Sequence, residues 1–304
     1  MRFPRWLLTG PALVTIVVAA CGGGAGPGPA AKPDVTVASF NFAESRILAE
    51  LYGQVLEANG YKVERKHNLG NREIVFPAIE NGDINFVPEY LATVLAFATK
   101  ATTHVADAAQ AHRQLQEAVR AKGLTVLDFA PAVDTNAFVV TKATAQRYRL
   151  TKMSDLAAVA GELTLGGPPE CPQRPFCIQG LRQTYGITFK EFRPLDPGGP
   201  LTVAAVEAGQ VQVGLLFSTD AQIAAKGFVL LEDDKKLQAA DNVVPLVRQR
   251  LADGGGEEFR RLVNGVSAKL TTAKLTDLNK QVAIDRKEPR DVARDWLKAE
   301  GLVR

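Results

Sequence analysis

The sequence contains few of the side chains that most often carry catalysis or bind metals. Only three histidines and three cysteines occur among its 304 residues. His67, His104 and His112 lack the i, i+4 spacing that places two metal ligands on one face of a helix. The sequence also lacks a Gly-x-Ser-x-Gly nucleophile elbow and a dinucleotide-type glycine fingerprint that opens a helix after a strand. We therefore expect no metal, no cofactor and no enzymatic activity.

An excess of charge of either sign is also lacking. The chain has 36 basic and 33 acidic residues, and these are interspersed along its length. This pattern excludes the basic footprint of a nucleic-acid-binding protein, so we expect no nucleic-acid partner. An apolar content of 46% indicates a packed core, and the length suffices for one large domain or two medium ones.

A hydrophobic run long enough to cross a bilayer is missing as well. Residues 6–20 are mostly apolar, but a transmembrane helix needs about 20 residues, and Pro11 interrupts the run. Arg2 and Arg5 precede the run, and small residues lead up to Cys21. A basic start, a short apolar segment and small residues at the cut predict that residues 1–20 form a secretory signal peptide.

Cys21 stands at the predicted cleavage position. A cysteine there is similar to the signal of bacterial lipoproteins, in which the thiol receives a diacylglyceryl group and becomes the new N-terminus. The alternative is a soluble secreted protein with a chance cysteine. The segment 21–33 consists of Cys21 followed by glycine, alanine, proline and one lysine, which predicts a lipid-anchored flexible tether. We expect the rest of the chain to be extracytoplasmic, anchored to the cell membrane by this N-terminal lipid.

The two remaining cysteines, Cys171 and Cys177, lie close together in a segment with two prolines. An oxidising compartment favours a disulfide between them. Metal binding is the weaker alternative, because two thiols need further ligands and no histidine lies near.

Strand-like and helix-like stretches alternate along the chain. An apolar stripe from Ile47 to Leu56 predicts a helix that ends at Asn59-Gly60. Further helices are predicted at residues 73–80, at 106–122 and in two stretches within 275–302, the second capped by Asp291. Strands are predicted at residues 35–40, 61–67, 84–87, 125–127, 138–140 and 163–166. This alternation predicts an α/β fold with mainly parallel strand pairing.

A weak internal repeat links two distant parts of the chain. Residues 78–86 and 205–213 share one pattern, in which a helix end, a glycine turn and a strand follow each other. Tyr90 comes after the first strand and Phe217 after the second. Two lobes of similar build, each with an aromatic side chain beyond a strand's carboxyl end, predict a ligand held between them. The alternative is that the repeat is a coincidence.

Several segments together indicate a family through their order and spacing. They are Asn41-Phe42 with Glu44, residues 60–66, Asn68-Leu69-Gly70, Pro88-Glu89-Tyr90 with Thr93, Phe217-Ser218-Thr219-Asp220, residues 230–235 and residues 245–248. In these segments the chain from residue 34 onward resembles the substrate-binding proteins of osmoprotectant ABC transporters, the glycine betaine, choline and proline type.

This resemblance implies a bilobed periplasmic-binding-protein fold of type II, with two lobes joined by two hinge crossings. Lobe one would comprise residues 34–138 plus 246–304, and lobe two residues 139–245. The implied function is to capture a quaternary amine in the cleft between the lobes and to deliver it to an ABC permease. The implied partners are the small-molecule ligand and the permease subunits, and we expect the protein to be a monomer.

The family holds its ligand in a box of aromatic rings, because a methylated cation cannot donate hydrogen bonds. Each contact between the cation and a ring face contributes about 0.5–2 kcal/mol. The resemblance implies that the ligand-binding residues are Phe40, Tyr90, Thr93, Asn136, Phe138, Arg174, Phe217 and Asp241. Among these, Thr93 and Arg174 match residues that help to hold the ligand's carboxylate in betaine-binding members.

The chain departs from the family pattern at several of these positions. Phe138 and Phe217 stand where tyrosines are usual, Asp241 where a fourth aromatic is usual, and Phe40 where a lysine is common. Arg72-Glu73 replaces small hydroxyl residues. The alternative interpretations are that Phe138 and Phe217 are core residues, that Arg174 is an ordinary loop arginine, and that Asp241 lies at the surface.

These departures leave the ligand open. A non-betaine small molecule, such as a polar aromatic, could fit between the ring faces in the same transport role. A less favoured alternative is an extracytoplasmic enzyme on the same fold.

Overall fold

The computed structural model describes residues 1–3, 31–101 and 105–304. The chain divides into two units, Met1–Ala31 and Lys32–Arg304, and only the second forms the fold described below. Residues 4–20 of the predicted signal peptide, Cys21 with most of the predicted tether, and His104 lie outside the described residues. Within the described part, no helix is long and apolar enough to cross a membrane.

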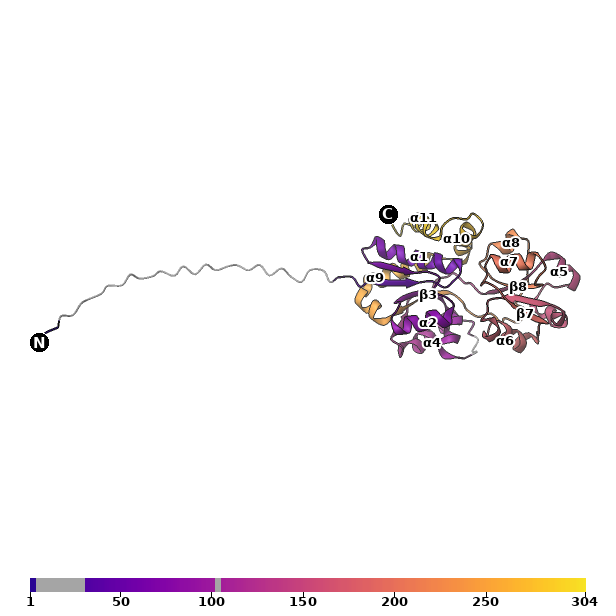
Figure 1. The fold of residues 1–304 in the computed structure, drawn as a ribbon, viewed down its shortest axis with the longest axis horizontal. Coiled ribbons are helices and arrows are strands. Elements are labelled where there is room, and N and C mark those ends of the chain that lie inside the picture. Colours follow the sequence, from indigo (N-terminus) through magenta and orange to yellow (C-terminus); the bar gives the residue numbers. More distant parts are fainter. Residues whose placement is uncertain (4–30, 102–104) are drawn as a thin grey trace. The chain divides into compact units, whose positions relative to one another are not determined.

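The first of two sheets has five strands in the order β2-β1-β3-β10-β4. Its strands are β1 (Val35–Ala38), β2 (Val63–Lys66), β3 (Phe86–Tyr90), β4 (Leu124–Val126) and β10 (Val243–Arg248). The helices of this part are α1 (Ala43–Ala58), α2 (Arg72–Asn81), α3 (Leu91–Thr99), α4 (Ala108–Arg120), α9 (Gln249–Lys269), α10 (Thr272–Ala283) and α11 (Pro289–Ala299). In Figure 1 the beginning and the end of the second unit lie together around this sheet, with α1 near the indigo end of the colour bar and α11 in yellow.

The second sheet also has five strands, in the order β7-β6-β8-β5-β9. Its strands are β5 (Asn136–Val140), β6 (Thr164–Gly167), β7 (Glu191–Pro194), β8 (Val213–Phe217) and β9 (Val229–Leu230). Its α-helices are α5 (Lys142–Tyr148), α6 (Ile178–Gly180), α7 (Pro200–Glu207) and α8 (Gln222–Ala225). Short helical turns occupy Met153–Ala158, Ala160–Glu162, Cys171–Gln173 and Leu181–Tyr185. The two sheets define two lobes, which the reader can follow in Figure 1.

The chain crosses between the lobes twice, a few residues earlier than the sequence predicts. β5 pairs only within the second sheet, so the first crossing lies before Asn136 and not at residue 138. β10 pairs only within the first sheet, so the return crossing lies before Val243 and not at residue 245. The two crossings contact each other through an antiparallel bridge between Val133 and Asn242.

The prediction of mainly parallel pairing is wrong, because both sheets are mixed. β10 runs antiparallel to β3 and β4, and β5 runs antiparallel to β8 and β9. Each of these strands enters its sheet from a crossing and is inserted between strands of the same lobe. β1 pairs in parallel with β2 and β3, and β6 pairs in parallel with β7 and β8, as expected for strands connected by helices.

The predicted helices follow their apolar faces and their stop signals. In α1, Ile47, Leu48 and Leu51 are fully buried, and the helix ends at Asn59 before Gly60, whose φ of 79° favours glycine. The predicted cap Asp291 is wrong: Glu288 precedes the first helical residue of α11, and Pro289 opens the helix. Asp291 instead lies in the first turn, where a carboxylate interacts favourably with the helix dipole.

The internal repeat is confirmed as a structural equivalence. α2 ends at Gly82 and leads into β3, whereas α7 ends before Gly209 and leads into β8. Both glycines have positive φ, 91° and 68°. Tyr90 is the last residue of β3 and Phe217 is the last residue of β8. Equivalent strand ends of the two lobes therefore carry these two rings.

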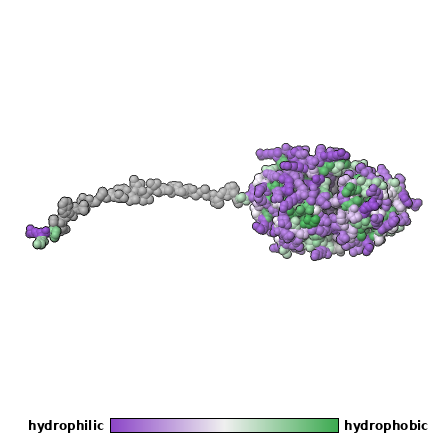
Figure 2. Space-filling model, in the orientation of Figure 1, coloured by the Kyte–Doolittle hydropathy of each residue, from purple (hydrophilic) through white to green (hydrophobic). Residues whose placement is uncertain are grey.

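The core divides between the lobes. The larger cluster surrounds the first sheet and includes Tyr52, Phe86 and Phe259, while the cluster of the second lobe includes Phe138, Leu165 and Leu181. On the face shown in Figure 2 hydrophilic side chains predominate, and hydrophobic residues form small patches.

Candidate ligand-binding site

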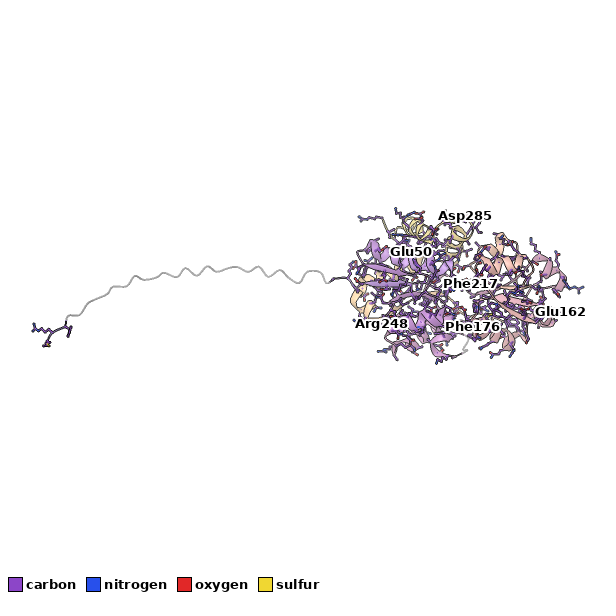
Figure 3. The ribbon with its side chains drawn as sticks, viewed as in Figure 1. Glu50, Glu162, Phe176, Phe217, Arg248 and Asp285 are labelled. Atoms are coloured by element: carbon purple, nitrogen blue, oxygen red, sulfur yellow. A yellow bond between two sulfur atoms is a disulfide. The ribbon has the colours of Figure 1, made fainter. Side chains whose placement is uncertain are left out.

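A cavity of about 400 Å³ lies between residues of the two lobes. Seven of the eight ligand-binding residues predicted from the sequence line it: Phe40, Tyr90, Thr93, Asn136, Arg174, Phe217 and Asp241. In Figure 3 the labelled Phe217 and Phe176 lie where the two lobes meet. Residues that are far apart in the sequence are thus brought together at the strand ends and the crossings.

Phe138 is the one predicted site residue that does not line the cavity. Its side chain is 1% exposed, and it packs in the core of the second lobe. In the β5–β8 register Asn136 lies opposite Phe217 at the strand ends, and Phe138 lies opposite Leu215, two residues deeper. Of these two predicted site residues on β5, Asn136 lines the cavity and Phe138 lies in the core.

Aromatic rings from both lobes form one wall of the cavity. Phe42 is at their centre: its ring centroid lies 5.9 Å from that of Phe40, 6.1 Å from that of Tyr90 and 5.2 Å from that of Phe217. Phe42 directly precedes α1. Phe42 is not among the site residues predicted from the sequence, although Asn41-Phe42 belongs to a segment that indicates the family.

A buried carboxyl group holds Tyr90 from behind. The Tyr90 hydroxyl donates to Glu44 over 2.7 Å, and Glu44 is 5% exposed. Thr219 from the second lobe and Asn279 from α10 also donate to this carboxyl group. Burial raises the pKa of Glu44, although these donors oppose the shift. Tyr90 thus presents its ring to the cavity while its hydroxyl is engaged elsewhere.

Asp134, in the first crossing, is a second buried carboxyl group beside Glu44. It accepts hydrogen bonds from the backbone N–H of Thr219 at 3.0 Å and from the hydroxyl of Ser218 at 3.1 Å. Burial, and next the nearby Glu44, raise its pKa well above its usual range. Asp134 also lines the cavity. It is not among the predicted site residues, because no local sequence pattern marks the crossing.

Arg72 and Glu89 form a nearly enclosed ion pair at the cavity. Arg72 donates from Nε to Oε1 at 2.9 Å and from Nη2 to Oε2 at 2.7 Å. Their side chains are 9% and 0% exposed. The Arg72 guanidinium lies 5.2 Å from the ring centroid of Phe40. The charge of this arginine is therefore balanced by a carboxylate on β3.

Arg174 pairs with Glu73 across the two lobes. Its Nη2 lies 2.9 Å from Oε2 of Glu73, and its guanidinium lies 5.4 Å from the ring centroid of Phe97 on α3. Burial, and next the charge of Arg72, lower the pKa of Arg174. Arg174 is therefore at the cavity, as the resemblance implies, but it already has a carboxylate partner.

Thr93 and Asp241 contact each other at the cavity. The backbone N–H of Thr93 donates to Oδ1 of Asp241 at 2.7 Å, and its hydroxyl donates to Oδ2. Asp241 is 5% exposed, so the surface alternative for this residue is wrong. Burial raises the pKa of Asp241 to about 6, although the Thr93 hydrogen bonds oppose the shift.

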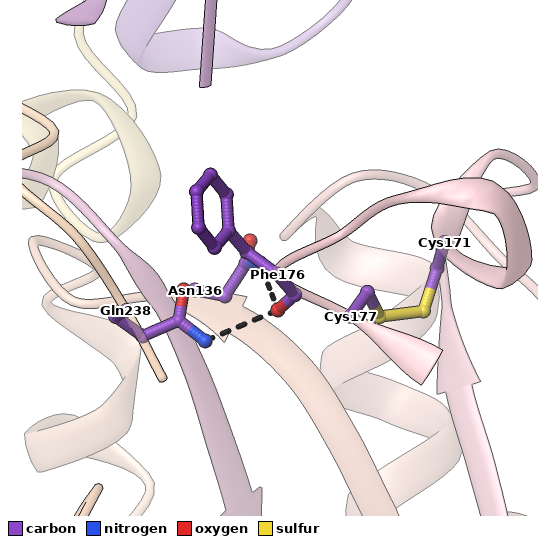
Figure 4. Close-up of a disulfide and its surroundings, with 5 residues drawn as sticks. All are labelled: Asn136, Cys171, Phe176, Cys177 and Gln238. Atoms are coloured by element: carbon purple, nitrogen blue, oxygen red, sulfur yellow. Dashed lines mark hydrogen bonds between the residues drawn. A yellow bond between two sulfur atoms is a disulfide. The ribbon is translucent and has the colours of Figure 1, made fainter. Parts of the chain in front are cut away.

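The predicted disulfide between Cys171 and Cys177 is present, and its loop forms part of the cavity wall. The loop carries Arg174 and Phe176, which is 4% exposed and packs against Ala92 and Ala96 of α3. Asn136 Nδ2 donates to the carbonyl of Phe176 at 2.9 Å, and Gln238 Nε2 donates to the same oxygen at 3.1 Å (Figure 4). The disulfide thus lies in the loop that supplies two side chains to the cavity.

A second cavity, of about 520 Å³, adjoins the first and shares Asn41, Phe42, Pro197 and Phe217 with it. It is lined in addition by Arg46, Asp220 and Asn279. Burial raises the pKa of Asp220 to about 6. The Phe42–Phe217 contact therefore separates two parts of one cleft.

The described residues contain no group of three or more histidine, cysteine, aspartate or glutamate side chains arranged to hold a metal ion. His67 contacts Glu50 through Nε2 at 2.8 Å, and His112 contacts the carbonyl of Leu127 at 2.9 Å. Both described histidines therefore have structural partners.

Comparison with known proteins gives consistent matches over nearly the whole chain. A family model described as the substrate-binding domain of ABC-type glycine betaine transport systems matches residues 33–299. The chain is 28% identical over 302 residues to a glycine-betaine-binding protein of Pseudomonas aeruginosa, covering 96% of each chain. It is 27% identical over 276 residues to the carnitine transport binding protein OpuCC of Listeria monocytogenes, covering 90% of this chain and 88% of that protein.

Among solved structures, the chain is similar to the crystal structure of a glycine betaine/carnitine/choline ABC transporter protein. The TM-score is 0.69 and the identity 29%, with 88% of this chain and 99% of that chain covered. The two mixed sheets with flanking helices form the type II periplasmic-binding-protein fold expected from the sequence.

Proposed function

The chain belongs to the family of substrate-binding domains of ABC-type glycine betaine transport systems, and on this premise we propose that it binds a quaternary ammonium solute in the cleft between its lobes. The solute class includes glycine betaine and choline. The protein then delivers this ligand to the permease of an ABC transporter. Its role is binding and not catalysis.

One observation supports this function above all others: rings from both lobes meet at one cavity. Phe42 and Tyr90 come from lobe one, Phe217 comes from lobe two, and their centroids lie 5.2 to 6.1 Å apart around Phe42. A methylated ammonium group offers no hydrogen-bond donor and is attracted to the faces of such rings. Because the rings belong to different lobes, closure of the cleft would enclose the cation and strengthen each contact.

The cellular setting that we propose follows from the N-terminal sequence. Residues 1–20 would direct export, Cys21 would carry the lipid, and residues 21–33 would tether the binding domain to the cell membrane. In this position a monomeric binding protein stays within reach of its permease without diffusing away.

Calorimetric titration of the protein without residues 1–20 tests the proposal. The panel contains glycine betaine, choline, carnitine and a set of neutral polar aromatics. We expect saturable, one-to-one binding of at least one quaternary amine, and a loss of at least tenfold in affinity, about 1.4 kcal/mol, for Phe42→Ala. Binding of polar aromatics alone would favour the alternative ligand, and chemical conversion of the bound ligand would indicate an enzyme.

A further inference from the structure

The cationic side chains that line the cavity differ in whether a carboxylate already pairs with them and in how far solvent reaches them. Arg72 is held by three hydrogen bonds from its guanidinium to Glu89, and both side chains are nearly enclosed. Lys100, also on the lining, is exposed at the C-terminal end of α3 and is therefore well solvated. Neither cation is well placed to bind a ligand's carboxylate, because Arg72 is already paired with Glu89 and Lys100 is exposed to solvent.

Arg174 is the cation best placed to reach a ligand's carboxylate, and Glu73 already occupies it. Arg174 lies in the disulfide loop of lobe two, and Glu73 lies in the first turn of α2 in lobe one. The Nη2–Oε2 distance is 2.9 Å, and the Arg174 side chain is only 15% exposed. The position of its guanidinium over Phe97 fixes it further. A ligand's carboxylate would have to displace Glu73 before it could pair with Arg174.

Two other carboxyl groups on the cavity, Asp241 and Asp134, accept no hydrogen bond from a cationic side chain among the described residues. Asp241 accepts its hydrogen bonds from the N–H and hydroxyl of Thr93, and Asp134 accepts from Ser218 and from the N–H of Thr219. These donors are neutral, so they leave the negative charge of an ionised carboxylate in place. Asp241, with a pKa of about 6, is ionised at neutral pH. A cation that enters the cavity therefore gains from Asp241, whereas a second carboxylate is repelled by it.

We propose that Glu73 determines the charge class of the ligand, so that the cleft selects quaternary ammonium cations without a carboxylate, of which choline is a simple example, over zwitterions. The inference rests on the proposed function and adds its selectivity. The physical reason is that the carboxylate of a zwitterion would be desolvated in the cleft without a free cationic partner. An unpaired buried charge is costly, and this cost discriminates between otherwise similar ligands.

Alternatively, the Glu73–Arg174 ion pair could only stabilise the contact between the lobes, with no effect on which ligand binds. In that case removal of Glu73 would weaken closure around any ligand, and it would lower the affinities for choline and glycine betaine by the same factor. Selection by charge makes a different prediction, because it changes the ratio of the two affinities.

The variant Glu73→Gln separates the two cases. Glutamine keeps the size and an oxygen acceptor but leaves the charge of Arg174 uncompensated. The matched control is Glu170→Gln, which removes from the same cavity lining a carboxylate that acts on Arg174 less than Glu73 does, and which leaves the Glu73–Arg174 ion pair in place. Dissociation constants for choline and glycine betaine are measured by calorimetry for each protein at one ionic strength, with melting temperature as a check on folding.

We expect the wild type to bind choline more tightly than glycine betaine. Glu73→Gln should move the ratio of the two dissociation constants at least tenfold toward glycine betaine, and Glu170→Gln should move it by less than threefold. Adding Arg174→Gln to Glu73→Gln should cancel the shift, because the released cation is then gone.

An unchanged ratio in Glu73→Gln, or a wild type that prefers glycine betaine, would overturn the inference while leaving the proposed function intact. If the folded wild type binds no quaternary amine at all, the proposed function fails and the inference fails with it.

Discussion

The hydroxyl of Tyr90 donates to the carboxyl group of Glu44 over 2.7 Å, on the side of the ring that faces away from the ligand cavity. Glu44 lines the second cavity and not the first. This bond fixes the orientation of the ring and shifts electron density toward it. In the proposed function Tyr90 would therefore contact a ligand through its π-face, while its hydroxyl bonds to Glu44.

Removal of the Tyr90 hydroxyl should accordingly cost less affinity than removal of its ring. Tyr90→Phe keeps the ring face, and we expect ligand affinity to fall by only a few-fold. Tyr90→Ala removes the cation–π contact and should weaken binding at least tenfold, about 1.4 kcal/mol. Titration calorimetry on both variants checks the difference. Equal losses would mean that the hydroxyl contacts the ligand.

Truncation of Phe217 and of Phe138 should have opposite consequences. Phe217 lines the cavity, so Phe217→Ala should lower affinity at least tenfold with little change in melting temperature. Phe138 is 1% exposed in the core of lobe two, so Phe138→Ala should lower stability by about 3–5 kcal/mol. Affinity and melting temperature are measured for both. A destabilised Phe217→Ala with unchanged affinity would show that Phe217 is a core residue.

Affinity for a cationic ligand should depend on pH through Asp241. Its pKa is raised to about 6 by burial, so it is ionised at pH 7.5 and becomes neutral as the pH falls below about 6. The charged groups nearest to it are Arg72 and Glu89, which form a pair with each other. A cation should therefore bind more weakly at pH 5 than at pH 7.5.

Two variants assign this pH dependence. Asp241→Asn should lower affinity at pH 7.5 and flatten the profile between pH 7.5 and pH 5, because the charge of Asp241 is then no longer lost on acidification. Asp220, whose pKa is also raised to about 6, lines only the second cavity. Asp220→Asn should therefore show the same dependence of affinity on pH as the wild type. A profile that persists in Asp241→Asn but disappears in Asp220→Asn would contradict this assignment.

Loss of the disulfide should weaken both stability and binding. Replacing Cys171 and Cys177 by serine opens a loop with a sequence separation of 6, and the entropy model predicts a loss of about 2 kcal/mol in stability. Affinity should also fall, because the loop carries Arg174 and Phe176 on the cavity wall. Thiol titration of the unfolded, non-reduced wild type should find no free thiol at these two positions.

The lipid anchor has a simple test. Cys21→Ala should release the protein from the membrane fraction of an expressing bacterial cell, and intact mass should show acylation of the wild type alone. If the variant stays with the membrane and the wild type carries no acyl mass, the proposed anchor is wrong.

The sequence predicted the fold well where local signals are strong. The apolar stripe of α1 and the glycine stops at Gly60 and Gly82 placed the helices closely. The predicted strand direction was wrong where it depends on contacts between distant parts of the chain. β5 and β10 look like ordinary strands in the sequence, and they run antiparallel to their neighbours because each enters its sheet from a crossing. α3 was not predicted, because its residues are apolar on every face and show no helical period.

The candidate site shows the same division. Tyr90 and Phe217 were found because they follow strands in a repeated pattern, and Thr93 and Asp241 proved to contact each other. Phe138 was misplaced by two residues along its strand, which changed a cavity position into a core position. The pairing of Arg174 with Glu73 joins residues 101 positions apart, and no local pattern indicates such a contact.

The bridge between the two crossings also determines how the cleft can move. Val133 pairs with Asn242, and the N–H of Asp134 donates to the carbonyl of Asp241 at 3.0 Å. A rotation axis near these strands displaces each atom in proportion to its distance from the axis. Asp134 and Asp241 would therefore keep their spacing as the lobes rotate, while Phe42 and Phe217 would change theirs. For a ligand bound in this cleft, the two carboxyl groups would therefore keep their positions while the rings move toward it.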